Sequence, residues 1–152
     1  MAIYLALLDE NPADRKQAER LLYRESSYRA SLNDALYFET YGNETAFFPF
    51  MEKYDLIFID AAKAQYINYL PVCKKMLCDG GLLVSDNVLF DGDIVLSRFA
   101  VRRRDRTIHA RMREYLRAVS EDEELVTTIL PVGDGMTVSV KTRGGSAQND
   151  QA

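Results

Sequence analysis

Residues 54–63 read Tyr-Asp-Leu-Ile-Phe-Ile-Asp-Ala-Ala-Lys, an apolar run that ends on Asp60. The length of the run and its β-branched and aromatic residues predict a strand that is buried on both faces, as the central strands of parallel sheets are. Helices must cover both faces of such a strand, so the flanking segments should contain helices and further strands. This stretch therefore indicates an α/β fold.

Strand and helix patterns alternate on both sides of this stretch. Apolar runs predict further strands at 2–8, 34–41, 82–84, 125–130 and 136–141, and helical spacing predicts helices at 13–29, 66–77 and 106–119. Asn11-Pro12 is typical of a helix start with Asn11 as N-cap, and residues 131–135 predict a hairpin turn. We expect a three-layer, doubly wound, mostly parallel sheet of the Rossmann or flavodoxin-like kind, with a C-terminal antiparallel hairpin at one edge.

Composition is that of one folded domain. The chain has 152 residues, of which 47% are hydrophobic and 28% charged, so it can build a core within a solvated surface. The net charge of −4 argues against a general nucleic-acid binder. No apolar run approaches the roughly 20 residues that cross a bilayer, and residues 1–8 lack the basic start of a signal peptide. We expect a cytoplasmic protein without membrane contact, whose cysteines, Cys73 and Cys78, are reduced and share one helix.

Three segments remain outside this regular pattern. Residues 44–51 predict a short helix that Pro49 limits, residues 90–104 an irregular loop, and residues 144–152 a disordered tail. Asp79-Gly80-Gly81 is typical of a helix end. We therefore expect a single domain over residues 1–143.

Polar residues follow three of the predicted parallel strands. They are Asp9-Glu10, Asp60 and Ser85-Asp86-Asn87. The carboxyl ends of parallel strands meet at one edge of the sheet, where ligands of such folds bind. Carboxylate and amide oxygens suit a hard divalent cation such as Mg²⁺. The alternative is that these residues only cap the helices that follow.

Residues 54–142 resemble the metal-dependent, catechol-type class I O-methyltransferases, particularly the small bacterial ones. The resemblance is carried by the stretch quoted above, by Gly80–Leu89, by Arg104–His109 and by Leu130–Met136. It implies that Asp60, Asp86 and Asn87 bind a divalent cation and that Lys63 is the general base. It also implies S-adenosylmethionine as cofactor, a small catechol-like or hydroxyl substrate, and a homodimer.

The first part of the chain departs from that family. A class I methyltransferase needs a glycine-rich turn after its first strand, and here Asp9-Glu10-Asn11-Pro12 contains no glycine. The candidate for the acid that holds the cofactor ribose is Glu39. We therefore expect impaired binding of S-adenosylmethionine and weak or absent methyltransferase activity.

Residues 1–60 resemble the front of a response-regulator receiver domain, of the kind found ahead of LytTR-type DNA-binding domains. On this resemblance Asp9 and Glu10 would form the acidic metal-binding pair and Asp60 would accept the phosphoryl group. The later receiver signals are missing, since no Met-Pro-x-x-x-Gly-like loop follows Asp60. The sequence thus suggests a hybrid, with a receiver-like front at 1–53 and a methyltransferase-like back at 54–143. Receiver signalling and a non-catalytic chimeric fold are the alternatives to methyl transfer.

Overall fold

The computed structural model describes residues 2–31, 35–42, 54–90, 92–97 and 99–142. Within these residues one sheet has the strand order β2-β1-β3-β4-β6-β5. Its strands are β1 (Ala2–Asp9), β2 (Ala35–Tyr41), β3 (Tyr54–Asp60), β4 (Leu77–Ser85), β5 (Leu125–Leu130) and β6 (Met136–Lys141). The first four run parallel, and β6 pairs antiparallel with both β4 and β5. The expected mostly parallel sheet with an antiparallel hairpin at one edge is confirmed.

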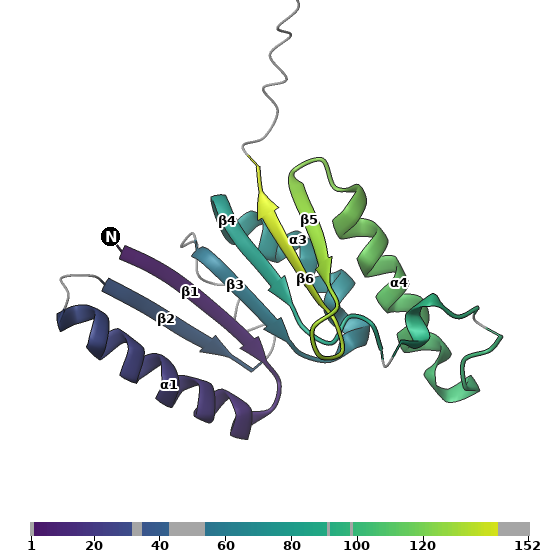
Figure 1. The fold of residues 1–152 in the computed structure, drawn as a ribbon, viewed down its shortest axis with the longest axis horizontal. Coiled ribbons are helices and arrows are strands. Elements are labelled where there is room, and N and C mark those ends of the chain that lie inside the picture. The colour runs from purple at the N-terminus through teal and green to yellow at the C-terminus, as the bar shows by residue number, and fades with distance from the viewer. Residues whose placement is uncertain (1, 32–34, 43–53, 91, 98, 143–152) are drawn as a thin grey trace, which may run out of the picture.

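The helices lie on both faces of this sheet (Figure 1). They are α1 (Pro12–Ser31), α3 (Tyr66–Met76) and α4 (Arg106–Glu121), with short 3₁₀ turns η1 (Lys63–Gln65), η2 (Asp93–Val95) and η3 (Arg103–Asp105). Helix α1 packs on β2, where the ring of Tyr23 meets Phe38 edge-on. Helices α3 and α4 cover the opposite face, and the buried core forms there between Ile57, Ile59 and Leu83 of the sheet and the helix side chains. The three layers of the prediction are present.

Local signals account for the start of α1. Asn11 Oδ1 accepts a hydrogen bond from the Ala13 amide at 3.0 Å, and Pro12 is the first helical residue. An N-cap oxygen satisfies an amide that has no partner within the helix, and proline lacks the amide that would otherwise stay unpaired. The predicted N-cap is confirmed.

The end of α3 differs from the prediction. The helix ends at Met76, and β4 begins at Leu77, so Cys78 lies in the strand and not in the helix with Cys73. Gly80, with φ of 80°, belongs to an irregular part of β4 where the pairing register with β3 shifts. A distant side chain replaces the expected glycine cap: Lys141 Nζ donates to the carbonyls of Lys74 and Leu77 at 2.7 and 3.0 Å.

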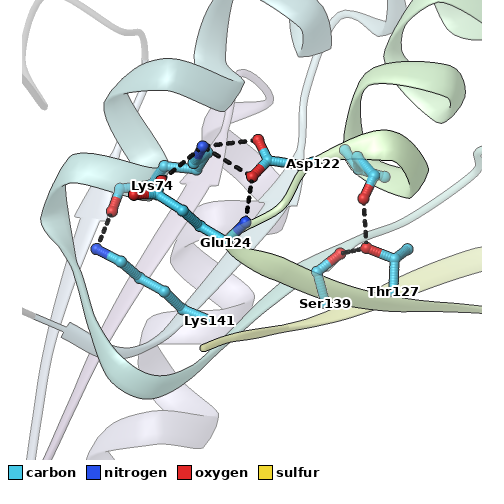
Figure 2. A network of polar contacts seen from close by, with 7 residues as sticks. Lys74, Asp122, Glu124, Thr127, Ser139 and Lys141 are labelled. Carbon is cyan, nitrogen blue, oxygen red and sulfur yellow. Dashed lines mark hydrogen bonds and ion pairs between the residues drawn. The ribbon is translucent and has the colours of Figure 1, made fainter. Parts of the chain in front are cut away.

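Figure 2 shows the polar network around this junction. Lys74 Nζ lies 2.7 Å from Asp122 Oδ2 and 2.7 Å from Glu124 Oε2, which joins α3 to the segment between α4 and β5. Lys141 adds β6 to the same cluster. The network holds the hairpin against α3 at the end of β4 that is remote from Asp86.

Two sequence predictions lie outside the described residues: the short helix at 44–51 and the tail at 144–152. Among the residues that the structure does describe, no helix is long and apolar enough to cross a membrane.

Candidate functional site

Three loops meet at the carboxyl edge of the parallel strands. One follows β3, one follows β4, and the third joins β5 to β6. The amides of Val88 and Leu89 donate to the carbonyls of Gly135 and Asp134 at 3.0 and 2.9 Å, which fastens the loop after β4 to the hairpin loop. Lys63 Nζ lies 3.2 Å from Asp134 Oδ2, which fastens the loop after β3 to the same hairpin. The sheet topology therefore brings Asp60, Asp86 and Asn87 to one edge, as their positions at the ends of parallel strands predicted, and the loop after β3 adds Lys63.

Gly135 of the hairpin loop packs closely against Leu89 of the loop after β4. Its φ is +79°, and a Cβ atom at this position would lie 2.1 Å from Leu89 Cγ. Only glycine adopts this backbone conformation freely, and only glycine leaves room for Leu89. The contact between the hairpin loop and the loop after β4 depends on this residue.

The carboxyl group of Asp60 is surrounded by other negatively charged side chains. Burial raises the pKa of its carboxyl above the ordinary 3.8, and the neighbouring Asp9, Asp86 and Asp14 raise it further, while Lys63 opposes them. Asp9 is the register partner of Asp60 across β1 and β3. Because converging carboxylates repel one another, a bound cation would relieve the repulsion.

Asp86 and Asn87 form a tight turn directly after β4. The Asp86 amide donates to the Ile59 carbonyl at 3.0 Å, and the Asn87 amide donates to Asp86 Oδ1 at 2.7 Å. Asn87 has φ of 54°, the left-handed region, which asparagine tolerates better than most residues. Beneath this turn, the buried hydroxyl of Tyr66 donates to the Asp86 carbonyl at 3.0 Å.

The donor set fits a hard cation that keeps part of its water shell. Among the described residues, no three histidine, cysteine or acidic side chains are grouped so that they could hold a metal ion by themselves. A cation held at this edge would have Asp60, Asp86 and the Asn87 amide oxygen as its candidate protein ligands, with water completing its shell. Mg²⁺ is commonly bound in this way, through one or two carboxylates and several waters.

Asp9 and Glu10, the acidic pair at the end of β1, have different hydrogen-bond partners. Asp9 is 6% exposed, and its Oδ1 accepts from the Asn11 amide at 2.7 Å. Glu10 Oε1 accepts from the Tyr69 hydroxyl of α3 at 3.0 Å. Asp9 thus lies beside Asp60, whereas Glu10 is bound to α3.

Glu39 is occupied by two tyrosines. Its Oε2 accepts from the hydroxyls of Tyr41 and Tyr54, which themselves lie 2.9 Å apart. Burial raises the pKa of Tyr54, and the hydrogen bond to Glu39 raises it further, so Tyr54 stays a donor. Glu39 holds β2 to the start of β3 in this structure; its predicted contact with a cofactor ribose stays a prediction.

The sequence did not single out Asp134, Tyr66 or Phe90. Asp134 pairs with Lys63, and the Phe90 ring lies 5.4 Å from Lys63 Nζ. The only sequence signal for Asp134 was its position in the hairpin loop, within the segment 130–136 that resembles the methyltransferases. Nothing in the sequence pointed to Tyr66, because its contact with Asp86 forms only once β4 pairs with β3.

Comparison with known proteins identifies a relationship over most of the chain. The O-methyltransferase family model matches residues 40–142. A caffeoyl-CoA O-methyltransferase of Citrus natsudaidai is 38% identical over 87 residues, which are 57% of this chain and 38% of that protein. The chain thus spans well under half the length of such relatives.

Solved structures show the same fold. A structure from Staphylococcus aureus has a TM-score of 0.67 at 21% identity and covers 91% of this chain and 76% of that one. An O-methyltransferase from Bacillus cereus, solved with SAH, has a TM-score of 0.62 at 20% identity and covers 91% and 73%.

These comparisons lend no support to the receiver-like interpretation of residues 1–60 or to phosphorylation of Asp60. The structural likeness covers 91% of the chain at 21% identity, so for residues 1–53 it shows the fold alone. The family match begins at residue 40, so it includes the end of the predicted front and does not extend to residues 1–39. The chain belongs to the O-methyltransferase family.

Proposed function

We propose that this chain is an S-adenosylmethionine-dependent O-methyltransferase domain with a divalent cation bound by Asp60, Asp86 and Asn87. The acceptor we propose is a small molecule with adjacent hydroxyl groups, in line with the caffeoyl-CoA named for the relatives. One observation carries the proposal: in a member of this family, Lys63 and these three residues lie at one sheet edge, in loops that hydrogen bonds and an ion pair join.

The residues divide the chemistry between them. A bound Mg²⁺ would hold the acceptor oxygens and lower the pKa of the hydroxyl to be methylated. Asp60 and Asp86 would supply the negative charge that retains the cation, and Asn87 a neutral oxygen. Lys63 would take the hydroxyl proton as general base. For that step the Lys63 amine has to be neutral, so its ion pair with Asp134 must open when the acceptor binds.

We also propose that the cofactor binds weakly. Instead of running into a glycine-rich turn, β1 ends on Asp9, whose carboxylate accepts from the Asn11 amide and whose carbonyl accepts from Arg15 Nη1 at 2.6 Å. Side chains fill the turn at which a glycine backbone would approach the cofactor closely. The homodimer that the resemblance implies stays a prediction, which sedimentation velocity would test.

Calorimetric titration of S-adenosylmethionine, with and without Mg²⁺, tests this function. We expect weak but saturable cofactor binding, and Mg²⁺ binding that Asp60→Asn and Asp86→Asn abolish. Asp79→Asn is the matched control, since Asp79 is an exposed acid elsewhere on β4. Methylation of a catechol with labelled cofactor would complete the assignment. Cooperative unfolding with no response to either ligand would instead support the non-catalytic alternative.

A further inference from the structure

The hydroxyl of Tyr66 lies between the two loops that carry the proposed metal ligands. It donates to the Asp86 carbonyl at 3.0 Å and accepts from the Ala61 amide at 3.4 Å. The side chain is fully buried, and its ring packs edge-on against Tyr115 with the ring centroids 5.4 Å apart. The packing fixes the ring, so the hydroxyl is a fixed point between the loop after β3 and the loop after β4.

The contact with Asp86 acts on the peptide group that precedes Asn87. The carbonyl of this peptide accepts from Tyr66, and its N–H donates to Asp86 Oδ1 at 2.7 Å. Both polar atoms of the peptide are thus held, and its plane is fixed. Asn87 follows with φ of 54°, a conformation that persists in non-glycine residues when the surrounding contacts enforce it. The direction of the Asn87 side chain relative to the Asp86 carboxylate depends on this arrangement.

We propose that Tyr66 is a positioning residue for the divalent cation site, whose hydroxyl holds the Asp86–Asn87 peptide so that both side chains are directed to the cation bound at Asp60. This inference rests on the proposed function, because it presupposes the cation. Tyr66 does not bind the cation itself. Without the hydroxyl the peptide can rotate and the two ligands lose their fixed orientation. Removing such a supporting group typically weakens metal affinity by about 10- to 100-fold.

The test is an Mg²⁺ titration of Tyr66→Phe, followed by the amide resonances of Asp60, Ala61 and Asn87. The matched control is Tyr115→Phe: this tyrosine is equally buried, belongs to the same ring pair, and bonds the Ser85 hydroxyl instead of a backbone carbonyl. We expect Tyr66→Phe to bind Mg²⁺ at least about tenfold more weakly than the wild type and Tyr115→Phe to bind it equally well. Equal affinity in Tyr66→Phe and the wild type would overturn the inference.

The outcomes separate this inference from the function on which it rests. Absence of Mg²⁺ binding in the wild type would contradict both. Wild-type binding that Asp60→Asn abolishes and Tyr66→Phe leaves intact would contradict this inference alone. If thermal melting shows that Tyr66→Phe does not fold, the test uses the wild-type fold instead, with 3-fluorotyrosine placed at position 66 or at position 115. Fluorine NMR then follows the labelled ring during the Mg²⁺ titration. Mg²⁺ should then shift the fluorine resonance at 66 and leave that at 115 unchanged, and no shift at 66 would reject the proposal.

Discussion

The ammonium of Lys63 lies 3.2 Å from the carboxylate of Asp134, a residue 71 positions further along the chain. The pair joins the loop after β3 to the turn between β5 and β6, so the conformation of the hairpin and the position of the proposed general base are linked. Both side chains are partly exposed, at 28% and 17%. Such a pair contributes little to stability, and its importance would lie in where it holds Lys63.

Asp134→Asn should therefore change function more than folding. We expect the free energy of unfolding to fall by at most about 1 kcal/mol, because the ion pair is partly screened by water. The rate of methyl transfer should in contrast change, because the carboxylate that holds the Lys63 ammonium at its position is gone. Urea denaturation and initial-rate measurements with labelled cofactor report the two effects. Asp105→Asn, at the exposed pair with Arg104, is the control for loss of a surface charge.

Asp60 should make stability depend on pH in a specific direction. Its folded-state pKa is raised above 3.8, so between the two pKa values the folded protein binds more protons than the unfolded chain. This contribution to stability is complete below pH 3.8 and is lost as the pH rises through the raised pKa. The difference in the free energy of unfolding between Asp60→Asn and wild type should accordingly grow, in favour of the variant, from pH 4 to pH 7. A difference that is constant with pH would show that Asp60 is unperturbed.

Mg²⁺ should act on the same repulsion. At pH 7 we expect Mg²⁺ to raise the melting temperature of the wild type, because a ligand that binds only the folded state stabilises it. The shift should disappear in Asp60→Asn and after addition of a chelator. Sodium chloride at equal ionic strength is the control that distinguishes cation binding from screening of the charges. An equal shift with sodium chloride would contradict a specific site.

Gly135→Ala should be strongly destabilising. The added methyl group meets Leu89 at 2.1 Å, and the backbone φ of +79° disfavours alanine. Strain and overpacking together should cost about 2–5 kcal/mol. Gly133→Ala is a close control in the same loop, because its φ of +60° carries the strain but nothing lies within 4 Å of the added carbon. Similar losses for the two variants, measured by urea denaturation, would show that the contact with Leu89 is unimportant.

Lys141→Met should loosen the end of α3. The variant leaves the carbonyls of Lys74 and Leu77 without the ammonium that now donates to both. Hydrogen bonds to charged groups contribute about 1.5–3 kcal/mol to stability. We expect a loss of stability in that range and faster hydrogen exchange at the end of α3. Lys75→Met, at an exposed lysine of the same turn, should change neither quantity.

Local patterns predicted most of the fold. The apolar run before Asp60, the Asn11-Pro12 helix start and the turn between the last two strands each depend on neighbours in the sequence, and the structure contains all three. The same reasoning failed at Gly80, which carries the φ expected of a helix end but lies within β4. A glycine permits several structures, and the contact that ends α3 comes from Lys141.

The candidate site shows the same division. The amino-acid sequence by itself determined that Asp60, Asp86 and Asn87 follow parallel strands, because polar residues at the ends of apolar runs are visible in any short window. Only the tertiary structure decided that Asp134 pairs with Lys63, that Glu39 binds two tyrosines, and that Tyr66 supports the Asp86 turn. Each of these contacts joins segments that the sheet brings together, and no periodicity along the chain encodes which side chains then meet.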